Sequence, residues 1–205
     1  MALKTFVKIS NVDNLSDARY CAGMMVDVIG FNLNEKTEGY ISAETFGEIT
    51  DWVAGVKFCG EFGDTDVASI KLASANYKLD FIETSQLDLL EELSELGIPL
   101  IYRAIIDANR DLNTIEKNID YAKEITSYVI VDFGNQITSA LSFNENNLAD
   151  ANMIISLKAD SNNLDAMITE GTYSGIELMG TPEDRPGFKD YDYVMDTLEA
   201  LEILD

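Results

Sequence analysis

The 205-residue sequence predicts a closed (β/α)8 barrel, the TIM-barrel architecture. Short apolar runs typical of strands alternate with amphipathic runs typical of helices from one end of the chain to the other. The strand and helix unit recurs about every 25 residues, with short polar links and no linker-like tract rich in Pro, Gly or Ser. Eight such units favour a closed barrel over an open, doubly wound sheet, and we expect residues 1–205 to form a single domain.

The first five units each join a strand run to a helix run: 3–10 with 15–24, 26–31 with 42–52, 56–62 with 66–77, 80–84 with 86–97, and 98–106 with 112–124. The last three begin with the strand runs 127–133, 152–157 and 173–180, and the seventh and eighth continue with the helix runs 162–171 and 191–204. Asn14 and Ser42 are suitable N-caps, and Gly97 can end a helix. Residues 135–151, in the sixth unit, have poor helical periodicity and several Asn, which favour turns. The sequence therefore leaves open whether a sixth helix forms.

The charge of the chain limits its partners. Asp and Glu total 37 against 14 Lys and Arg, which gives a formal net charge of -23. Such a field repels nucleic acid, anionic membranes and phosphorylated ligands, so we expect neither a nucleic-acid nor a membrane partner. The chain contains no His, which excludes a His general base, a His-containing triad and a His-ligated zinc site.

The N-terminal segment MALKTFVKIS has one Lys before a short alternating apolar run, which is typical of a strand rather than a signal peptide. No apolar run reaches the length needed to span a membrane, and we expect a cytoplasmic protein. Cys21 and Cys59 have no partners at metal-ligand spacing, so we expect two buried free thiols. We expect no metal and no cofactor. The sequence does not distinguish a monomer from a homodimer.

In a barrel of this kind the functional residues gather at the carboxyl ends of the strands. Lys8 and Ser10 lie two positions apart in the first strand run, and Asp132 lies at the end of the sixth. In–out alternation places these three side chains in a common cavity. A structural ion pair between Lys8 and Asp132 is an equal alternative, since buried charges are normally paired. Glu61 and Glu83 at the same rim are expected to be solvated carboxylates rather than metal ligands.

Two segments carry specific motifs: 173–198, YSGIELMGTPEDRPGFKDYDYVMDTL, and 6–33, FVKISNVDNLSDARYCAGMMVDVIGFNL. The first resembles the C-terminal segment of phosphoribosylanthranilate isomerases, where Ser-Gly-Val-Glu is followed by Arg-Pro-Gly-X-Lys-Asp and the last helix. The second is similar to the Lys-Ile-Cys-Gly opening of that family. GYIS (39–42), YRAI (102–105) and VIVDF (129–133) match further family segments in the same order and spacing. The resemblance thus extends over nearly the whole chain.

The resemblance implies an Amadori rearrangement of N-(5-phosphoribosyl)anthranilate in tryptophan biosynthesis, without a cofactor. It implies that Asp132 is the general acid, and that Ser10 occupies the position of the family's catalytic base, a Cys. A thiol has a reference pKa of about 8.5, whereas a serine hydroxyl needs a neighbouring base, for which Lys8 is the nearest candidate. If the protein is active, its partner is a phosphorylated sugar, and the residues expected to bind it are Lys8, Asn11, Arg103, Lys158 and Gly180.

Several departures from the family weaken this site. Gly39 replaces the Arg expected to bind the anthranilate carboxylate, and residues 156–158, Ser-Leu-Lys, replace Ser-Gly-Gly. Of the phosphate-binding glycines only Gly180 remains, and Arg185 and Lys189 are expected to serve the fold. The sequence therefore predicts an isomerase-like protein with weak or lost activity. The alternative is a non-catalytic or regulatory barrel, or an enzyme that acts on a different, less anionic ligand.

Overall fold

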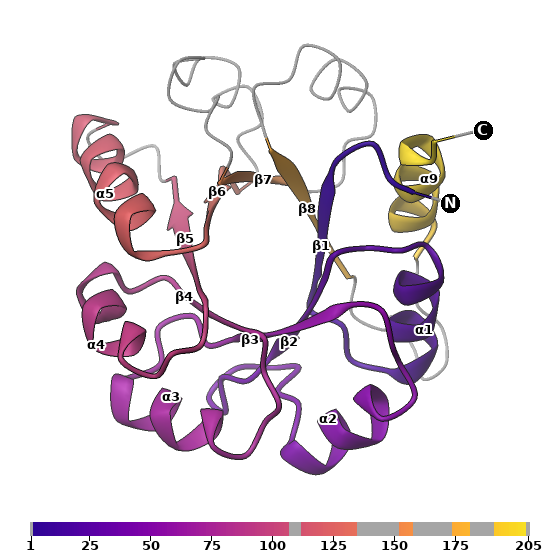
Figure 1. Ribbon diagram of the computed structural model, residues 1–205, viewed down its shortest axis with the longest axis horizontal. Coiled ribbons are helices and arrows are strands. Elements are labelled where there is room, and N and C mark those ends of the chain that lie inside the picture. The colour runs from indigo at the N-terminus through magenta and orange to yellow at the C-terminus, as the bar shows by residue number, and fades with distance from the viewer. Residues whose placement is uncertain (1, 107–111, 135–151, 158–173, 181–190, 204–205) are drawn as a thin grey trace.

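The computed structural model describes residues 2–106, 112–134, 152–157, 174–180 and 191–203. Parallel strands pair in chain order, and the last pairs with the first, so the predicted barrel is confirmed (Figure 1). Its strands are β1 (Phe6–Ser10), β2 (Val28–Asn32), β3 (Lys57–Glu61), β4 (Phe81–Thr84), β5 (Leu100–Ile105), β6 (Tyr128–Asp132), β7 (Met153–Leu157) and β8 (Gly175–Met179).

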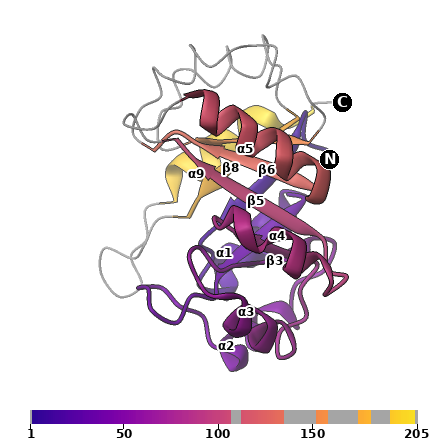
Figure 2. The ribbon, with the colours of Figure 1, turned by 90° about the vertical axis from the view of Figure 1, so that its left-hand side faces the viewer.

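Helices surround the barrel in the described part of the chain (Figure 1). They are α1 (Leu15–Gly23), α2 (Ala43–Thr50), α3 (Val67–Ser74), α4 (Leu90–Ser94) after the 3-10 turn η1 (Leu87–Leu89), α5 (Leu112–Ile125) and α9 (Asp192–Leu201). Viewed from the side, α5 lies against β5 and β6, with α4 next to it (Figure 2). The segment of the possible sixth helix, 135–151, and the residues Arg185 and Lys189 lie outside the described residues. Among the helices that are described, none combines the length and apolar character needed to cross a membrane.

The predicted helix ends are confirmed. The Asn14 side chain accepts a hydrogen bond from the Asp17 N–H at 2.9 Å, and Ser42 Oγ accepts from the Thr45 N–H at 3.2 Å. Gly97 follows α4 with a φ of 69°, a backbone conformation that favours glycine. Side chains therefore satisfy free backbone N–H groups at the starts of α1 and α2, and a glycine follows the end of α4.

The inside of the barrel has two layers. The layer toward the amino ends of the strands is apolar and consists of Val28, Cys59, Phe81, Ile101, Ile130 and Ile154. Two positions further along the strands, the inward side chains form a polar and charged layer, which includes Lys8, Glu61 and Glu83. A separate apolar core fills the space between the strands and the helices. As predicted, Cys21 and Cys59 are buried thiols that are not bound in a disulfide.

A single glycine makes room for the charged layer. A Cβ atom on Gly30 would lie 2.0 Å from Glu61 Oε1 and 3.0 Å from Lys8 Nζ. Because real Cβ atoms do not approach so closely, only a glycine at this position of β2 lets Lys8 and Glu61 meet inside the barrel.

Candidate functional site

Charged side chains from several strands meet inside the barrel at the carboxyl ends of the strands. We call these residues the mouth network: Lys8, Ser10, Glu61, Glu83, Arg103, Asp132 and Glu177. Strand alternation explains their gathering, since each occupies an inward position of its strand. The predicted convergence of Lys8, Ser10 and Asp132 at one end of the barrel agrees with this arrangement.

Lys8 lies at the centre of the network and is completely buried. Its Nζ lies 2.5 Å from Glu61 Oε1 and 2.9 Å from Glu177 Oε1. It also lies 2.9 Å from Glu83 Oε2. This contact is an ion pair, but its geometry does not make it a hydrogen bond. Burial alone would lower the pKa of Lys8, but the charges of Glu177, Glu61 and Glu83 outweigh it and raise the pKa well above 10.5. Lys8 is therefore an ammonium ion and is not available as the base that would activate Ser10.

Ser10, which the sequence resemblance matches to a catalytic base, is hydrogen-bonded on both sides. Its Oγ accepts a hydrogen bond from the Lys8 ammonium and donates one to Glu177 Oε1. Burial would raise the pKa of Glu177, but Arg103 and Lys8 lower it below its ordinary value. A carboxylate with a lowered pKa is a weak base. Glu177, which accepts the hydrogen bond from the Ser10 hydroxyl, therefore has little tendency to take the proton from it.

Arg103 joins the other side of the network. Its Nε lies 2.6 Å from Glu83 Oε1, and its Nη1 lies 3.1 Å from Asp132 Oδ2. Two further bonds reach Glu177, from Nη1 to Oε2 at 2.9 Å and from Nη2 to Oε1 at 2.5 Å. This paired contact holds a carboxylate in a fixed plane. The guanidinium, predicted to bind substrate, is thus already shared among three internal carboxylates.

Two expectations from the sequence need correction. The alternative ion pair between Lys8 and Asp132 does not form, because Lys8 pairs with three glutamates while Asp132 pairs with Arg103. Glu61 and Glu83 are not solvated rim carboxylates, since they are only 8% and 3% exposed and both pair with Lys8. The in–out alternation of strand residues predicts which side chains point into the barrel. It does not predict how deep each side chain lies along the barrel axis.

Glu177 is the residue of the mouth network that sequence reasoning missed. It lies in the middle of β8 and contacts Lys8, Ser10 and Arg103. An acidic residue inside the apolar run Ile-Glu-Leu-Met was the available signal, because a charge at the centre of a buried strand requires partners.

The network carries an excess of negative charge. Four carboxylates face two cations, a formal charge of −2 when all are ionised. Oxygen atoms of Glu61, Glu83 and Glu177 lie within 4.8 Å of one another, which is close enough for a shared cation. Lys8 Nζ, however, already lies within 2.9 Å of an oxygen of each. The ammonium thus occupies the position that a metal ion would need.

A cavity of about 230 Å³ lies above the network, bordered by Ser10, Asn11, Arg103 and Asp132. Asn11 has a φ of 55°, and its N–H donates to Glu61 Oε2 at 3.1 Å. The Gly180 N–H donates to the Ser10 carbonyl at 2.8 Å, so this amide is engaged inside the protein. Of the substrate-binding residues expected from the sequence, Lys158 lies outside the described residues.

Comparisons with known proteins give one curated relative and many similar barrels. No family model matches the chain. The N-(5'-phosphoribosyl)anthranilate isomerase of Nitrosomonas eutropha is 31% identical over 107 residues, which are 52% of this chain and 51% of that protein. The match therefore spans about half the length of this relative.

Similar solved structures cover nearly the whole chain. The phosphoribosyl anthranilate isomerase of Thermus thermophilus has a TM-score of 0.75 at 18% identity, covering 96% of this chain and 100% of that one. An isomerase in complex with reduced 1-(o-carboxyphenylamino)-1-deoxyribulose 5-phosphate gives 0.74 at 19% identity, with 95% and 97% covered. Monomers generated from the dimeric isomerase of Thermotoga maritima give 0.71 at 18%, with 96% and 100% covered. The resemblance to the phosphoribosylanthranilate isomerase family is therefore confirmed, in sequence over half of the chain and in fold over nearly all of it.

Proposed function

We propose that this chain is a phosphoribosylanthranilate-isomerase-like protein in which rearrangement of N-(5-phosphoribosyl)anthranilate is weak or lost. The observation that carries the proposal is the position of Ser10, whose hydroxyl lies between the Lys8 ammonium and the Glu177 carboxylate. The family resemblance implies tryptophan biosynthesis as the pathway of an active member.

The reaction needs a base to remove a carbon-bound proton and an acid to protonate the ring oxygen. At the base position, Ser10 donates its only proton to an ionised carboxylate. At the acid position, Asp132 pairs through Oδ2 with Arg103, and its Oδ1 accepts the Gly134 N–H at 2.8 Å. Both oxygen atoms are already engaged. The two groups are thus placed to stabilise the barrel and poorly placed to exchange protons with a substrate.

The charge of the site also opposes the isomerase's substrate, which carries a phosphate and a carboxylate. The mouth network has a formal excess of two negative charges, and its cations Lys8 and Arg103 are each shared by three carboxylates. Gly39 stands where the family's carboxylate-binding Arg is expected. These features favour the second candidate, a barrel that binds a different and less anionic small molecule.

Further expectations remain part of this proposal. We take residues 1–205 as one domain that acts in the cytoplasm as a monomer or homodimer, with a small-molecule ligand at the mouth. Asp132 and Ser10 remain the candidate catalytic residues, and Lys8, Asn11, Arg103, Lys158 and Gly180 the candidate ligand-binding residues.

A turnover assay on wild type and Ser10→Cys tests the proposal, with an active phosphoribosylanthranilate isomerase as the positive control. We expect wild-type kcat/KM far below the enzyme range that begins at about 10⁴ M⁻¹s⁻¹. Ser10→Cys is expected to stay low as well, because the anionic substrate is still repelled. Wild-type turnover within the enzyme range contradicts the proposal. A large gain from Ser10→Cys would show instead that only the base was lost and that the substrate still binds.

A further inference from the structure

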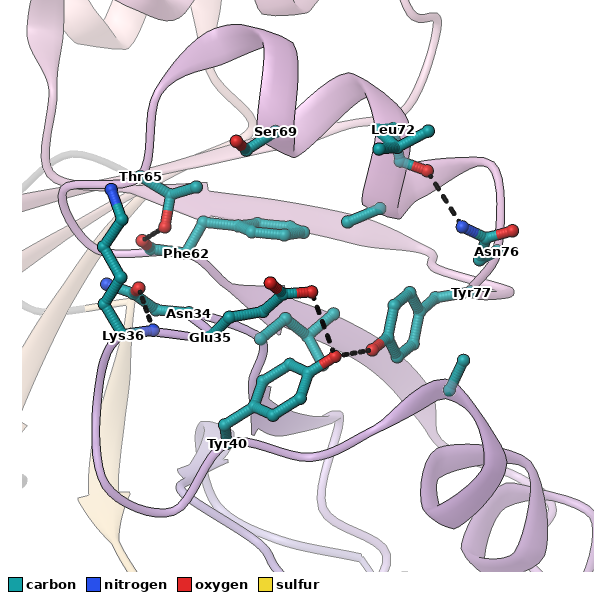
Figure 3. Close-up of a pocket in the computed structure, with 13 residues that line it drawn as sticks. Asn34, Glu35, Lys36, Tyr40, Phe62, Thr65, Ser69, Leu72, Asn76 and Tyr77 are labelled. Carbon is teal, nitrogen blue, oxygen red and sulfur yellow. Dashed lines mark hydrogen bonds between the residues drawn. The ribbon is translucent and has the colours of Figure 1, made fainter.

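A second cavity lies outside the barrel wall, and we call it the outer pocket. It has a volume of about 250 Å³ and lies between residues 33–40, which follow β2, and residues 62–77, which include α3 (Figure 3). Phe62 is the immediate neighbour of Glu61, and since Glu61 points into the barrel, Phe62 points outward. The outer pocket is therefore separate from the mouth cavity, although Asn34 borders both.

Three aromatic rings line the outer pocket; Phe62 is fully buried and Tyr77 is 8% exposed, so Tyr40 is the ring that solvent reaches. In Figure 3 the Phe62 ring lies above the pocket, the Tyr40 ring below, and the Tyr77 ring to the right. Tyr77 is held in place, because its hydroxyl donates to the Ile41 carbonyl at 3.0 Å. The Tyr40 hydroxyl lies 3.1 Å from that of Tyr77. Leu72 of α3, 71% exposed, extends the apolar surface.

A carboxylate belongs to the same opening. Glu35 lies between the rings of Phe62 and Tyr40 (Figure 3), and its Oε1 accepts a hydrogen bond from the Tyr40 hydroxyl at 3.4 Å. Lys36 lies at the edge beside Thr65.

From this geometry we propose that the outer pocket binds a small organic cation, an ammonium group attached to an apolar or aromatic body. The face of an aromatic ring attracts cations, a role that the partly exposed Tyr40 can fill, and the exposed Glu35 supplies the opposite charge. Leu72, which is largely exposed, offers apolar surface for the body of the ligand. The net charge of -23 raises the local concentration of cations and opposes anions. An apolar cavity of about 150 Å³ holds benzene, so this larger pocket has room for a ring with an ammonium side chain.

A matched series of probes tests the charge preference. Phenethylammonium, neutral 2-phenylethanol and anionic phenylacetate share one ring and one chain length, and each is titrated into the full chain by calorimetry and NMR. We expect phenethylammonium to bind best, phenylacetate worst, and the ammonium affinity to fall as salt is raised. Equal affinity for 2-phenylethanol, or no saturation by the ammonium up to about 10 mM, overturns the proposal.

Variants locate the binding. Glu35→Gln is expected to weaken the ammonium affinity about threefold, the size expected for an exposed charge pair. Tyr40→Leu, which removes one ring, is expected to weaken it about tenfold. Glu48→Gln on the exposed surface of α2 is the control and should leave the affinity unchanged. If Asp132→Asn weakens binding while Glu35→Gln and Tyr40→Leu do not, the cation binds at the mouth and the proposal is wrong.

Discussion

Lys8 Nζ and Glu177 Oε1 lie 2.9 Å apart inside the barrel, and neither side chain is exposed to solvent. The two residues are 169 positions apart in the sequence and lie opposite each other where β1 pairs with β8, the pairing that closes the barrel. An ion pair at this place links the first strand to the last. Removing either partner leaves the other charge buried with fewer counter-charges. The free energy of unfolding should therefore fall.

Replacement of the central cation should therefore destabilise the fold strongly. Lys8→Met leaves three glutamates facing one another, and we expect a loss of about 3–5 kcal/mol in the free energy of unfolding. Lys71→Met is the matched control, since Lys71 pairs with Glu92 on the surface at 2.7 Å, and its loss should stay below about 1 kcal/mol. Urea unfolding of both variants measures the difference. Equal losses would mean that the buried pairs contribute no more than a surface pair.

The need for glycine at position 30 is tested with a second pair of variants. Gly30→Ala places a methyl group 2.0 Å from Glu61 Oε1, and we expect a loss of about 1–3 kcal/mol as the network shifts. Gly47→Ala is the control, because a Cβ built at this position in α2 meets nothing within 4 Å apart from its chain neighbours and the backbone of its own helix. There the better helix propensity of Ala should raise stability by up to about 1 kcal/mol. A neutral Gly30→Ala would contradict the close contact between β2 and the network.

The contribution of Glu177 to stability can be identified by comparing Glu177→Gln with wild type at several pH values. The pKa of Glu177 in the folded protein is lowered from 4.5, so its stabilising effect is present above that value and is lost as pH falls through the folded pKa. Glu177→Gln should lower the free energy of unfolding by about 2–3 kcal/mol at neutral pH. Below the ordinary pKa of 4.5, the free energies of unfolding of variant and wild type should come closer together. On the alkaline side the raised pKa of Lys8 keeps its contribution intact until pH exceeds 10.5. If the difference in free energy of unfolding between Glu177→Gln and wild type does not change with pH, the ionised form of Glu177 is not its source.

Both thiols should be inert in the native protein. Cys21 and Cys59 are buried, and burial raises the pKa of the Cys59 thiol well above 9.0, although Lys8 acts in the opposite direction. A thiol reagent should label neither residue at neutral pH until denaturant is added, and then label both. Rapid labelling of native Cys59 would show that the barrel interior opens readily.

The sequence predicted the fold well because each strand and helix carries a local signal. Strand periodicity, the caps at Asn14 and Ser42, and the glycine after α4 are local properties that do not depend on distant residues. The convergence of Lys8, Ser10 and Asp132 followed from alternation alone.

The partners inside the barrel could not be predicted in the same way. Which glutamate meets Lys8 depends on the stagger between strands and on the reach of long side chains across the interior. Glu177, Glu61 and Glu83 all satisfy the alternation rule, as does Asp132, and only the three-dimensional arrangement separates them. The outer pocket was missed for a similar reason, since Tyr40 and Tyr77 are brought together by packing rather than by spacing.

The central claim is that the mouth network binds its own cations and so no longer takes the anionic ligand of the isomerases. Calorimetric titration with reduced 1-(o-carboxyphenylamino)-1-deoxyribulose 5-phosphate, the ligand of one similar structure, tests it most directly. The buffer should be low in phosphate, with inorganic phosphate titrated separately as the control. We predict no saturation up to about 1 mM. Micromolar binding of this ligand would show that the anion site remains functional and would contradict the account.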